Sequence, residues 1–305
     1  MDKPANLSSS NSEPLCAAAA GPDAQEAAAA FVAALLEELA LPGPVNLPCF
    51  PDIVPRVRQA LSDPQATPDD IARIVGAEPR LAARLQQTAN SAVFNPGGVP
   101  SSNLRHAVTR LGHQLVQSVT MVFAVQQMKN AGPLRAVVKP LSELWEKSIA
   151  VASICQLLAQ RLKVPTDRAF LTGLLHGIGH FYILVRSADA QRGMRYGEAL
   201  AAAAAERHPA VGGRVLRKWA FDAGVCEAVA GQNDHARQSK RKPDLTDVLI
   251  ASAALGGALL EHRGNLARCE GINAFESLGL DRKEQAAVLK HTEYSLGALR
   301  AALGG

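Results

Sequence analysis

Histidine and lysine side chains in three segments of the chain are the residues best suited to carry out chemistry. The segments are Leu144–Ser148, which contains Lys147, Gly173–His180 and His208–Trp219. Imidazole nitrogens bind metal ions and exchange protons near neutral pH. The first question is therefore whether these histidines form a metal site, a ligand pocket or part of a packed core.

His176 and His180 are four residues apart, which places them on one face of a helix running through Leu171–His180. This spacing binds zinc in His-Glu-x-x-His enzymes, where the residue after the first histidine is a catalytic glutamate. Here that residue is Gly177, and the sequence offers no clear third ligand. The pattern favours packed, hydrogen-bonded histidines over a metal site, and a ligand pocket formed by His176, His180 and Lys147 remains an alternative.

Other catalytic patterns are missing from the sequence. It contains no G-x-S-x-G nucleophile elbow and no cysteine with a patterned histidine partner. The glycine pairs at 97–98 and 256–257 lack the context of a phosphate-binding loop. Trp145 and Trp219 fall on the apolar stripes of their helices, so we expect core packing rather than base stacking.

Helices must position these side chains, because the composition favours an all-α fold. Hydrophobic residues make up 48% of the chain but aromatic residues only 4%, and alanine and leucine dominate. Thr67-Pro68 and Glu78-Pro79 mark helix starts, and Gly112 predicts a break. Pro209 is interpreted as the start of a helix that carries Val211, Val215 and Trp219.

Net charge, cysteine content and hydropathy argue against a nucleic-acid-binding, a disulfide-rich secreted or a membrane protein. The net charge of +4 is small, and the densest basic run, residues 240–242, is interpreted as a solvated loop, so nucleic acid is not expected as a partner. Five cysteines without a C-x-x-C pair suit a reducing cytoplasm, and Cys155 and Cys226 are expected to be buried. Neither a secretory signal nor a membrane-spanning stretch is recognised.

Short motifs along the chain, taken in order, resemble those of the HDOD family, the HD-related output domains. The resemblance spans approximately residues 40–260, with Glu78 where the family usually has aspartate. Besides the three segments above, the motifs are Leu47-Pro48-Cys49-Phe50-Pro51, the stretch Ile71–Pro79, Ala89-Asn90-Ser91-Ala92 and the stretch Ala107–Gly112.

The resemblance implies a multi-helix fold in which an N-terminal helical subdomain packs on a degenerate HD-like bundle. We assign residues 24–135 to the N-terminal part and 136–262 to the HD-like part. Residues 263–305 are expected to form a helical extension, and residues 1–23, rich in Ser, Asn, Pro and Ala, a disordered tail.

Catalytic HD relatives hold a divalent cation with a histidine, an adjacent His-Asp pair and a distant aspartate. By the resemblance, the first histidine corresponds to Lys147 and the His-Asp pair to His176-Gly177. A His-His pair common in relatives corresponds to Gln232-Asn233.

No aspartate lies between Val248 and Glu270, where the last carboxylate would be expected, and Asp247 comes one or two helical turns too early. At most His176 and His208 remain as ligands, with His235 a weaker candidate. We therefore expect no metal and no cofactor, because two imidazoles without a carboxylate hold a hard cation poorly.

The resemblance implies a non-catalytic signalling or regulatory module of a bacterial type. It would act through a signalling protein partner or a small phosphorylated ligand, away from membranes, with its oligomeric state left open. The alternative is a degenerate HD phosphohydrolase that acts on nucleotides or cyclic dinucleotides.

Overall fold

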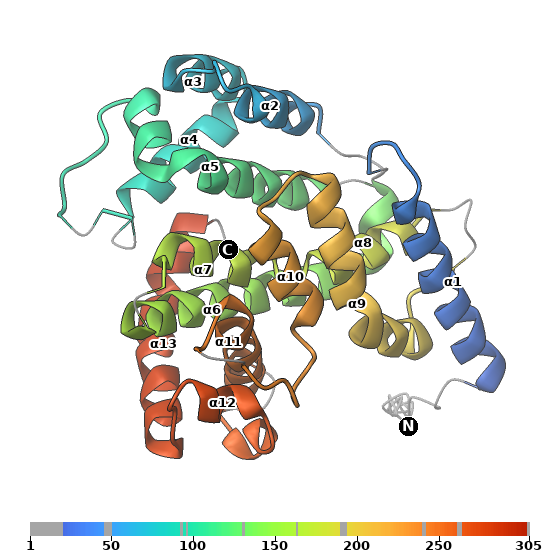
Figure 1. Ribbon diagram of the computed structural model, residues 1–305. Coiled ribbons are helices and arrows are strands. Elements are labelled where there is room, and N and C mark those ends of the chain that lie inside the picture. The colour runs from blue at the N-terminus through green and yellow to red at the C-terminus, as the bar shows by residue number, and fades with distance from the viewer. Residues whose placement is uncertain are drawn as a thin grey trace, which may run out of the picture.

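The computed structural model describes residues 21–45, 51–91, 94–95, 97–129, 132–162, 164–189, 194–239, 242–260 and 264–303. Their regular secondary structure is entirely helical, without a strand, which confirms the all-α prediction (Figure 1). The predicted tail falls outside the described residues except for 21–23, and its last two residues, Pro22 and Asp23, already belong to a helix. Most of the motif at 47–51, Ala92 and the basic residues Lys240 and Arg241 also lie outside them.

A layer of helices from the first half of the chain covers one end of the molecule (Figure 1). Its members are α2 (Ile53–Ser62), α3 (Pro68–Gly76), α4 (Pro79–Asn90) and α5 (Leu104–Lys129). Thr67 caps α3 as predicted, since its hydroxyl accepts from the Asp70 backbone N–H while the Asp70 carboxylate accepts from the Thr67 N–H. Gly112 interrupts α5 with φ 71° and ψ 168°, a conformation suited to glycine, which confirms the predicted break.

The larger part of the chain forms a bundle around the helix α6. Its members are α6 (Val138–Leu162), α7 (Thr166–Leu175), α8 (Ile178–Ser187), α9 (Glu198–Lys218), α10 (Ala223–Gly231) and α11 (Leu245–Leu260), with a 3-10 turn, η1 (Gly132–Val137), before α6. Helix α6 packs against α7 and α11, and α9 packs against α8 and α10. Trp145 and Trp219 are buried, as are Cys155 and Cys226, so these core predictions are confirmed.

Close helix packing in the bundle depends on glycine. A Cβ atom added at Gly173 would lie 2.6 Å from the Ala152 Cα, and one at Gly179 would lie 2.0 Å from the His208 carbonyl oxygen. Neither position has room for a side chain, so α7 meets α6, and α8 meets α9, at backbone distance. This brings the segments that carry His176, His180 and His208 together.

Helix α9 differs from the prediction because Pro209 lies inside it rather than at its start. Proline has no N–H, so it leaves the carbonyl of Ala205 without its usual helical donor. The Asn233 amide donates to that carbonyl at 3.2 Å from a different part of the chain. A tertiary contact therefore supplies the donor that the proline lacks.

Helix α1 (Pro22–Ala40) was assigned to the N-terminal subdomain but packs against α9 of the bundle (Figure 1). Its buried face consists of Ala28, Val32, Leu35 and Leu39. Near its end, the Glu38 carboxylate forms two hydrogen bonds of 2.7 and 2.9 Å with the buried guanidinium of Arg186. Apart from the placement of α1, the predicted boundary between the two helical parts, at residues 135 and 136, stays a prediction.

In the last part of the chain, the final helix packs against α6, and the shorter elements before it pack against α11. This part consists of the 3-10 turn η3 (Leu266–Cys269), α12 (Asn273–Ser277) and α13 (Arg282–Leu303). One stretch, Thr166–Ser187, is long and apolar enough to cross a membrane by length and composition alone. It spans α7 and α8, and 89% of its most apolar window is buried inside the protein, as in a core segment.

Candidate functional site

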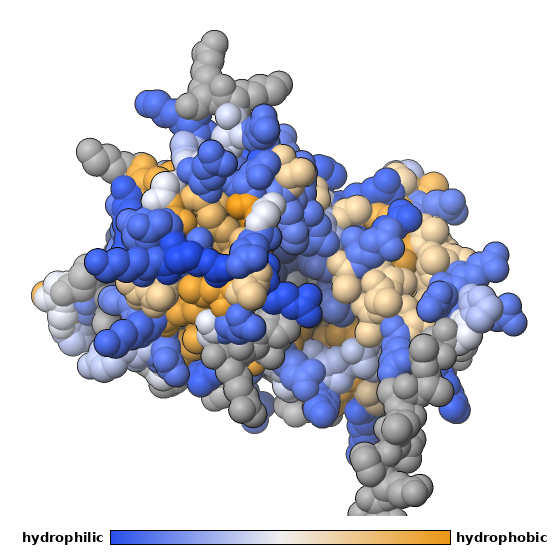
Figure 2. Space-filling view, turned by 90° about the horizontal axis from the view of Figure 1, so that it is seen from below, coloured by the Kyte–Doolittle hydropathy of each residue, from blue (hydrophilic) through white to orange (hydrophobic). Residues whose placement is uncertain are grey.

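A cleft of about 920 Å³ brings the candidate site residues together. Its walls come from α6, the turn between α7 and α8, α9, the segment after α10, and α11. The candidate residues that line it are Lys147, His176, Gly177, His180, His208, Gln232, Asn233 and His235. Figure 2 shows a hollow on the lower face of the molecule, between the side with α1 and α9 and the side with α12 and α13.

His176 follows the last residue of α7, and the chain turns at Gly177 before α8 begins. The prediction of one continuous helix through His180 was therefore wrong, although both histidines face the same cleft. The His176 Nδ1 donates to the Gly173 carbonyl at 2.8 Å, which leaves Nε2 as the acceptor of the neutral ring. Burial, reinforced by the nearby Lys147 charge, lowers the pKa of His176 to about 4.

His180 and His208 stack on each other, with ring centroids 5.6 Å apart and planes 27° apart. Burial and then Lys147 lower the pKa of His180 to about 4. The pKa of His208 is also well below its usual value, first because of burial and then because of His180, His176 and Lys147. Its Nδ1 is buried and has no hydrogen-bond partner among the described residues. These rings are neutral at pH 7.

Lys147 extends from α6 into the same cleft. Its positive charge contributes to the low pKa of all three histidines, so its ammonium acts on the whole imidazole cluster. A divalent cation placed among these rings would meet the same repulsion. An anion would instead be attracted.

Gly177, which the sequence resemblance aligns with the HD aspartate, lies beside the Leu144 side chain. A Cβ atom at Gly177 would lie 2.7 Å from the Leu144 Cδ1 and 3.4 Å from the Ser148 Oγ. The backbone, at φ −85° and ψ 4°, would accept any residue. A side chain at this position would therefore require the Leu144 side chain to move, whereas the backbone would not be strained.

Gln232 and Asn233, which the sequence resemblance aligns with the His-His pair, donate hydrogen bonds to backbone carbonyls. The Gln232 Nε2 lies 2.9 Å from the carbonyl oxygens of both His176 and Val229. The Asn233 Nδ2 donates to Ala205, as described above. Gln232 thus joins the end of α10 to the turn between α7 and α8, and Asn233 joins the segment after α10 to α9.

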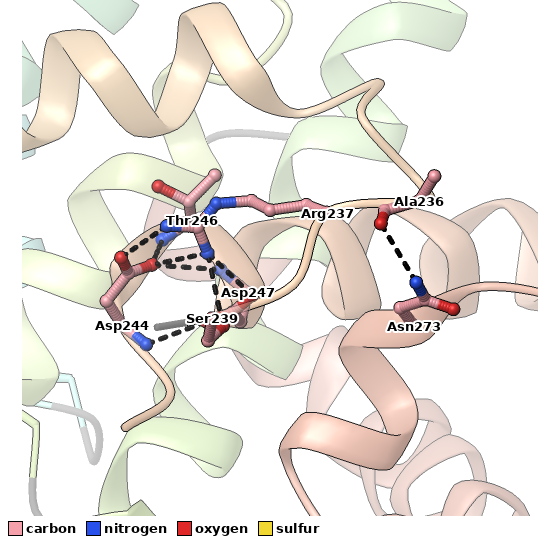
Figure 3. Close-up of polar contacts among 7 residues, drawn as sticks. All are labelled: Ala236, Arg237, Ser239, Asp244, Thr246, Asp247 and Asn273. Carbon is pink, nitrogen blue, oxygen red and sulfur yellow. Dashed lines mark hydrogen bonds and ion pairs between the residues drawn. The ribbon is translucent and has the colours of Figure 1, made fainter. Parts of the chain in front are cut away.

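Asp247 is engaged in a network of its own (Figure 3). Its Oδ1 lies 2.6 Å from the Arg237 Nη1, and its Oδ2 accepts from the Ser239 hydroxyl and from the Asp244 backbone N–H. Asp247 is fully buried and does not line the cleft. It fixes the loop after α10, consistent with the interpretation that it stands too early to be the HD carboxylate.

The described residues include no group of three or more His, Cys, Asp or Glu side chains arranged to hold a metal ion. Two features of the cleft were missed by sequence reasoning. One is a wall of small residues on α11, including Ala254 and Gly257, and the other is Arg300, which enters from α13 and pairs with Glu146 at 2.6 Å. No local signal indicated that the C-terminal helix would reach the cleft.

An all-helical bundle with histidines gathered in one cleft agrees with the HD-related class that the motifs indicated. Residues 47–235 match the family model of the HDOD domain, and the chain belongs to the HDOD family. No curated protein matched the chain.

Solved structures share this fold at low sequence identity. A protein from Shewanella amazonensis SB2B, whose name suggests a metal-dependent phosphohydrolase, is 23% identical with a TM-score of 0.69, covering 91% of this chain and 99% of that one. An HDOD domain protein of unknown function from Geobacter sulfurreducens is 21% identical with a TM-score of 0.54, covering 91% and 97%. These likenesses concern the fold.

Proposed function

We propose that this HDOD protein is a non-catalytic regulatory module of the bacterial cytoplasm whose cleft binds a small phosphorylated ligand and signals to a protein partner. The proposal rests on what the side chains do at the positions that the resemblance aligns with the HD metal site. Gln232 and Asn233 donate to backbone carbonyls, and Lys147 acts on the histidine cluster. These contacts suit a binding site better than a metal centre.

The chemistry of the cleft favours an anion. Metal-dependent phosphoryl transfer needs carboxylate and imidazole ligands around a divalent cation. Two carboxylates line the cleft, but Glu146 pairs with Arg300 and Glu143 is exposed beside Lys139. The histidines gather instead with Lys147, and Leu144 fills the space beside Gly177. An ammonium group binds phosphate as a point charge, and imidazole N–H groups add hydrogen bonds.

The first test is hydrolysis of nucleotides and cyclic dinucleotides with Mn²⁺, Mg²⁺ or Ni²⁺. We expect no turnover above buffer. Metal-dependent turnover that His176→Ala abolishes would overturn the proposal. It would favour the alternative, a degenerate phosphohydrolase, for which the gathering of His176, His180 and His208 in one cleft is the supporting observation.

The second test is calorimetric titration with inorganic pyrophosphate as the probe. We expect Lys147→Met to weaken binding at the cleft at least about tenfold, because it removes the ammonium and keeps most of the stem. Lys139→Met is the matched control, since Lys139 lies on the same helix with an exposed side chain and does not line the cleft. Equal affinity in Lys147→Met and the wild type would refute an anion site centred on Lys147.

A further inference from the structure

A second pocket lies between α4 and α5, in the N-terminal layer, and shares no lining residue with the cleft. Its volume is about 340 Å³. We call it the α4–α5 basic pocket. It is lined by Arg80, Ala83, Arg84, Gln87, Phe123, Gln126 and Gln127.

The spacing of these residues shows that facing stripes of two helices form the pocket. Residues 80, 83, 84 and 87 lie on one face of α4, and residues 123, 126 and 127 lie on one face of α5. Facing stripes of packed helices are usually apolar. Here Phe123 forms a buried apolar base, and arginine and glutamine supply most of the remaining wall.

Arg84 is the central residue of the pocket. Its Nη1 is buried and has no hydrogen-bond partner among the described residues, and its Nη2 reaches the Gln126 Oε1 only at 3.4 Å. Burial lowers the pKa of Arg84, and no carboxylate acts in the opposite direction. A partly buried guanidinium without a counter-charge is costly, so an anion in the pocket would supply what the protein does not.

The remaining lining residues match an anion as well. Arg80 contributes a second guanidinium, and the lining contains neither aspartate nor glutamate. Two guanidinium groups balance a phosphate dianion, and their planar forks can each donate two hydrogen bonds to its oxygens. The amides of Gln87 and Gln127 are further donors.

We propose that the α4–α5 basic pocket binds the phosphate group of a small anionic ligand, independently of the cleft. The pocket falls within the usual range of small-molecule sites, of roughly 300–1,000 Å³, at its lower end. A phosphate group with a small substituent is the occupant that its size and two arginines favour.

The test compares thermal unfolding in inorganic phosphate, in sodium chloride and in sodium succinate at equal ionic strength. All proteins in this test carry Lys147→Met, which removes the ammonium group on which the proposed anion site of the cleft depends. A phosphate effect in this background can therefore be assigned to the α4–α5 basic pocket rather than to the cleft. We expect phosphate at ten times its Kd to raise Tm by about 3 °C over chloride. Equal effects of phosphate and chloride, or of phosphate and succinate, would overturn the proposal.

Arg84→Met is the decisive variant, since methionine keeps the apolar stem and removes the charge. We expect it to lose the phosphate effect, whereas Arg56→Met, which changes an exposed arginine on α2, retains it. Equal loss in both variants would overturn the proposal. If Arg84→Met does not fold, Arg80→Met takes its place, because Arg80 is exposed and its substitution should leave the fold intact. A full phosphate effect in Arg80→Met would overturn the proposal.

Discussion

The side-chain amide of Gln232 lies 2.9 Å from the backbone carbonyl of His176 and so joins the end of α10 to the turn between α7 and α8. Gln232 is 3% exposed, and its Nε2 also donates to the Val229 carbonyl. Gln232 therefore holds two segments of the cleft together. The contribution of Gln232 to the free energy of unfolding can be measured by substitution.

Gln232→Ala is expected to lower the free energy of unfolding by about 2 kcal/mol, because it leaves buried carbonyls without this donor. Denaturant unfolding would measure the change. Gln238→Ala is the matched control, since Gln238 is exposed, and its effect should stay within about 0.5 kcal/mol. Equal effects of the two substitutions would show that the Gln232 contacts do not contribute.

His176 makes stability depend on pH. Its folded pKa is about 4 against an ordinary value of 6.5, so the unfolded chain takes up a proton first as the pH falls. Stability is complete above pH 6.5 and declines towards pH 4, by roughly 3 kcal/mol for this single residue.

His176→Asn removes the titrating group and keeps a donor for the Gly173 carbonyl. The difference between wild-type and variant unfolding free energies should therefore change between pH 6.5 and 4 and stay constant above pH 7. A pH-independent difference would show that the folded and unfolded pKa values of His176 are alike.

Asp247 should contribute to stability through the loop that follows α10 (Figure 3). Asp247→Ala removes the acceptor for Arg237, Ser239 and the Asp244 N–H, and is expected to cost about 3 kcal/mol. Asp234→Ala, at an exposed position nearby, should change unfolding by less than about 0.5 kcal/mol. Similar losses at both positions would contradict a structural role specific to Asp247.

The docking of α1 depends on the pair formed by Glu38 and Arg186. Glu38→Gln should cost about 2 kcal/mol, because the Arg186 guanidinium is buried and loses its counter-charge while Glu38 itself is a third exposed. The double variant Glu38→Leu/Arg186→Met should recover most of this loss, since it removes the charge that needs a partner. A double variant less stable than Glu38→Gln would contradict this account.

Local features of the fold were predictable from the sequence where one residue type had one physical role. Thr67 caps α3 and Gly112 breaks α5 because a side-chain acceptor and a left-handed backbone conformation are local requirements. Pro209 was misinterpreted because the donor that makes an internal proline tolerable, Asn233, is distant in the sequence. Tertiary contacts of this kind carry no local signal.

The order of the motifs indicated which segments would meet, and Lys147, His176, His208 and Gln232 do line one cleft. The chemical properties of the site could not be predicted from the sequence in the same way. The low pKa values of the histidines arise from burial, and the entry of Arg300 depends on how α13 packs. Neither burial depth nor helix docking can be derived from spacing alone.

The position of Leu144 beside Gly177 has a consequence for any attempt to engineer a metal site into the cleft. An aspartate introduced at position 177 would require the Leu144 side chain to move, and the side chains at 232 and 233 would still be amides engaged with backbone carbonyls rather than imidazoles. A single substitution is therefore not expected to create a metal-binding site, because several side chains and their contacts would have to change together.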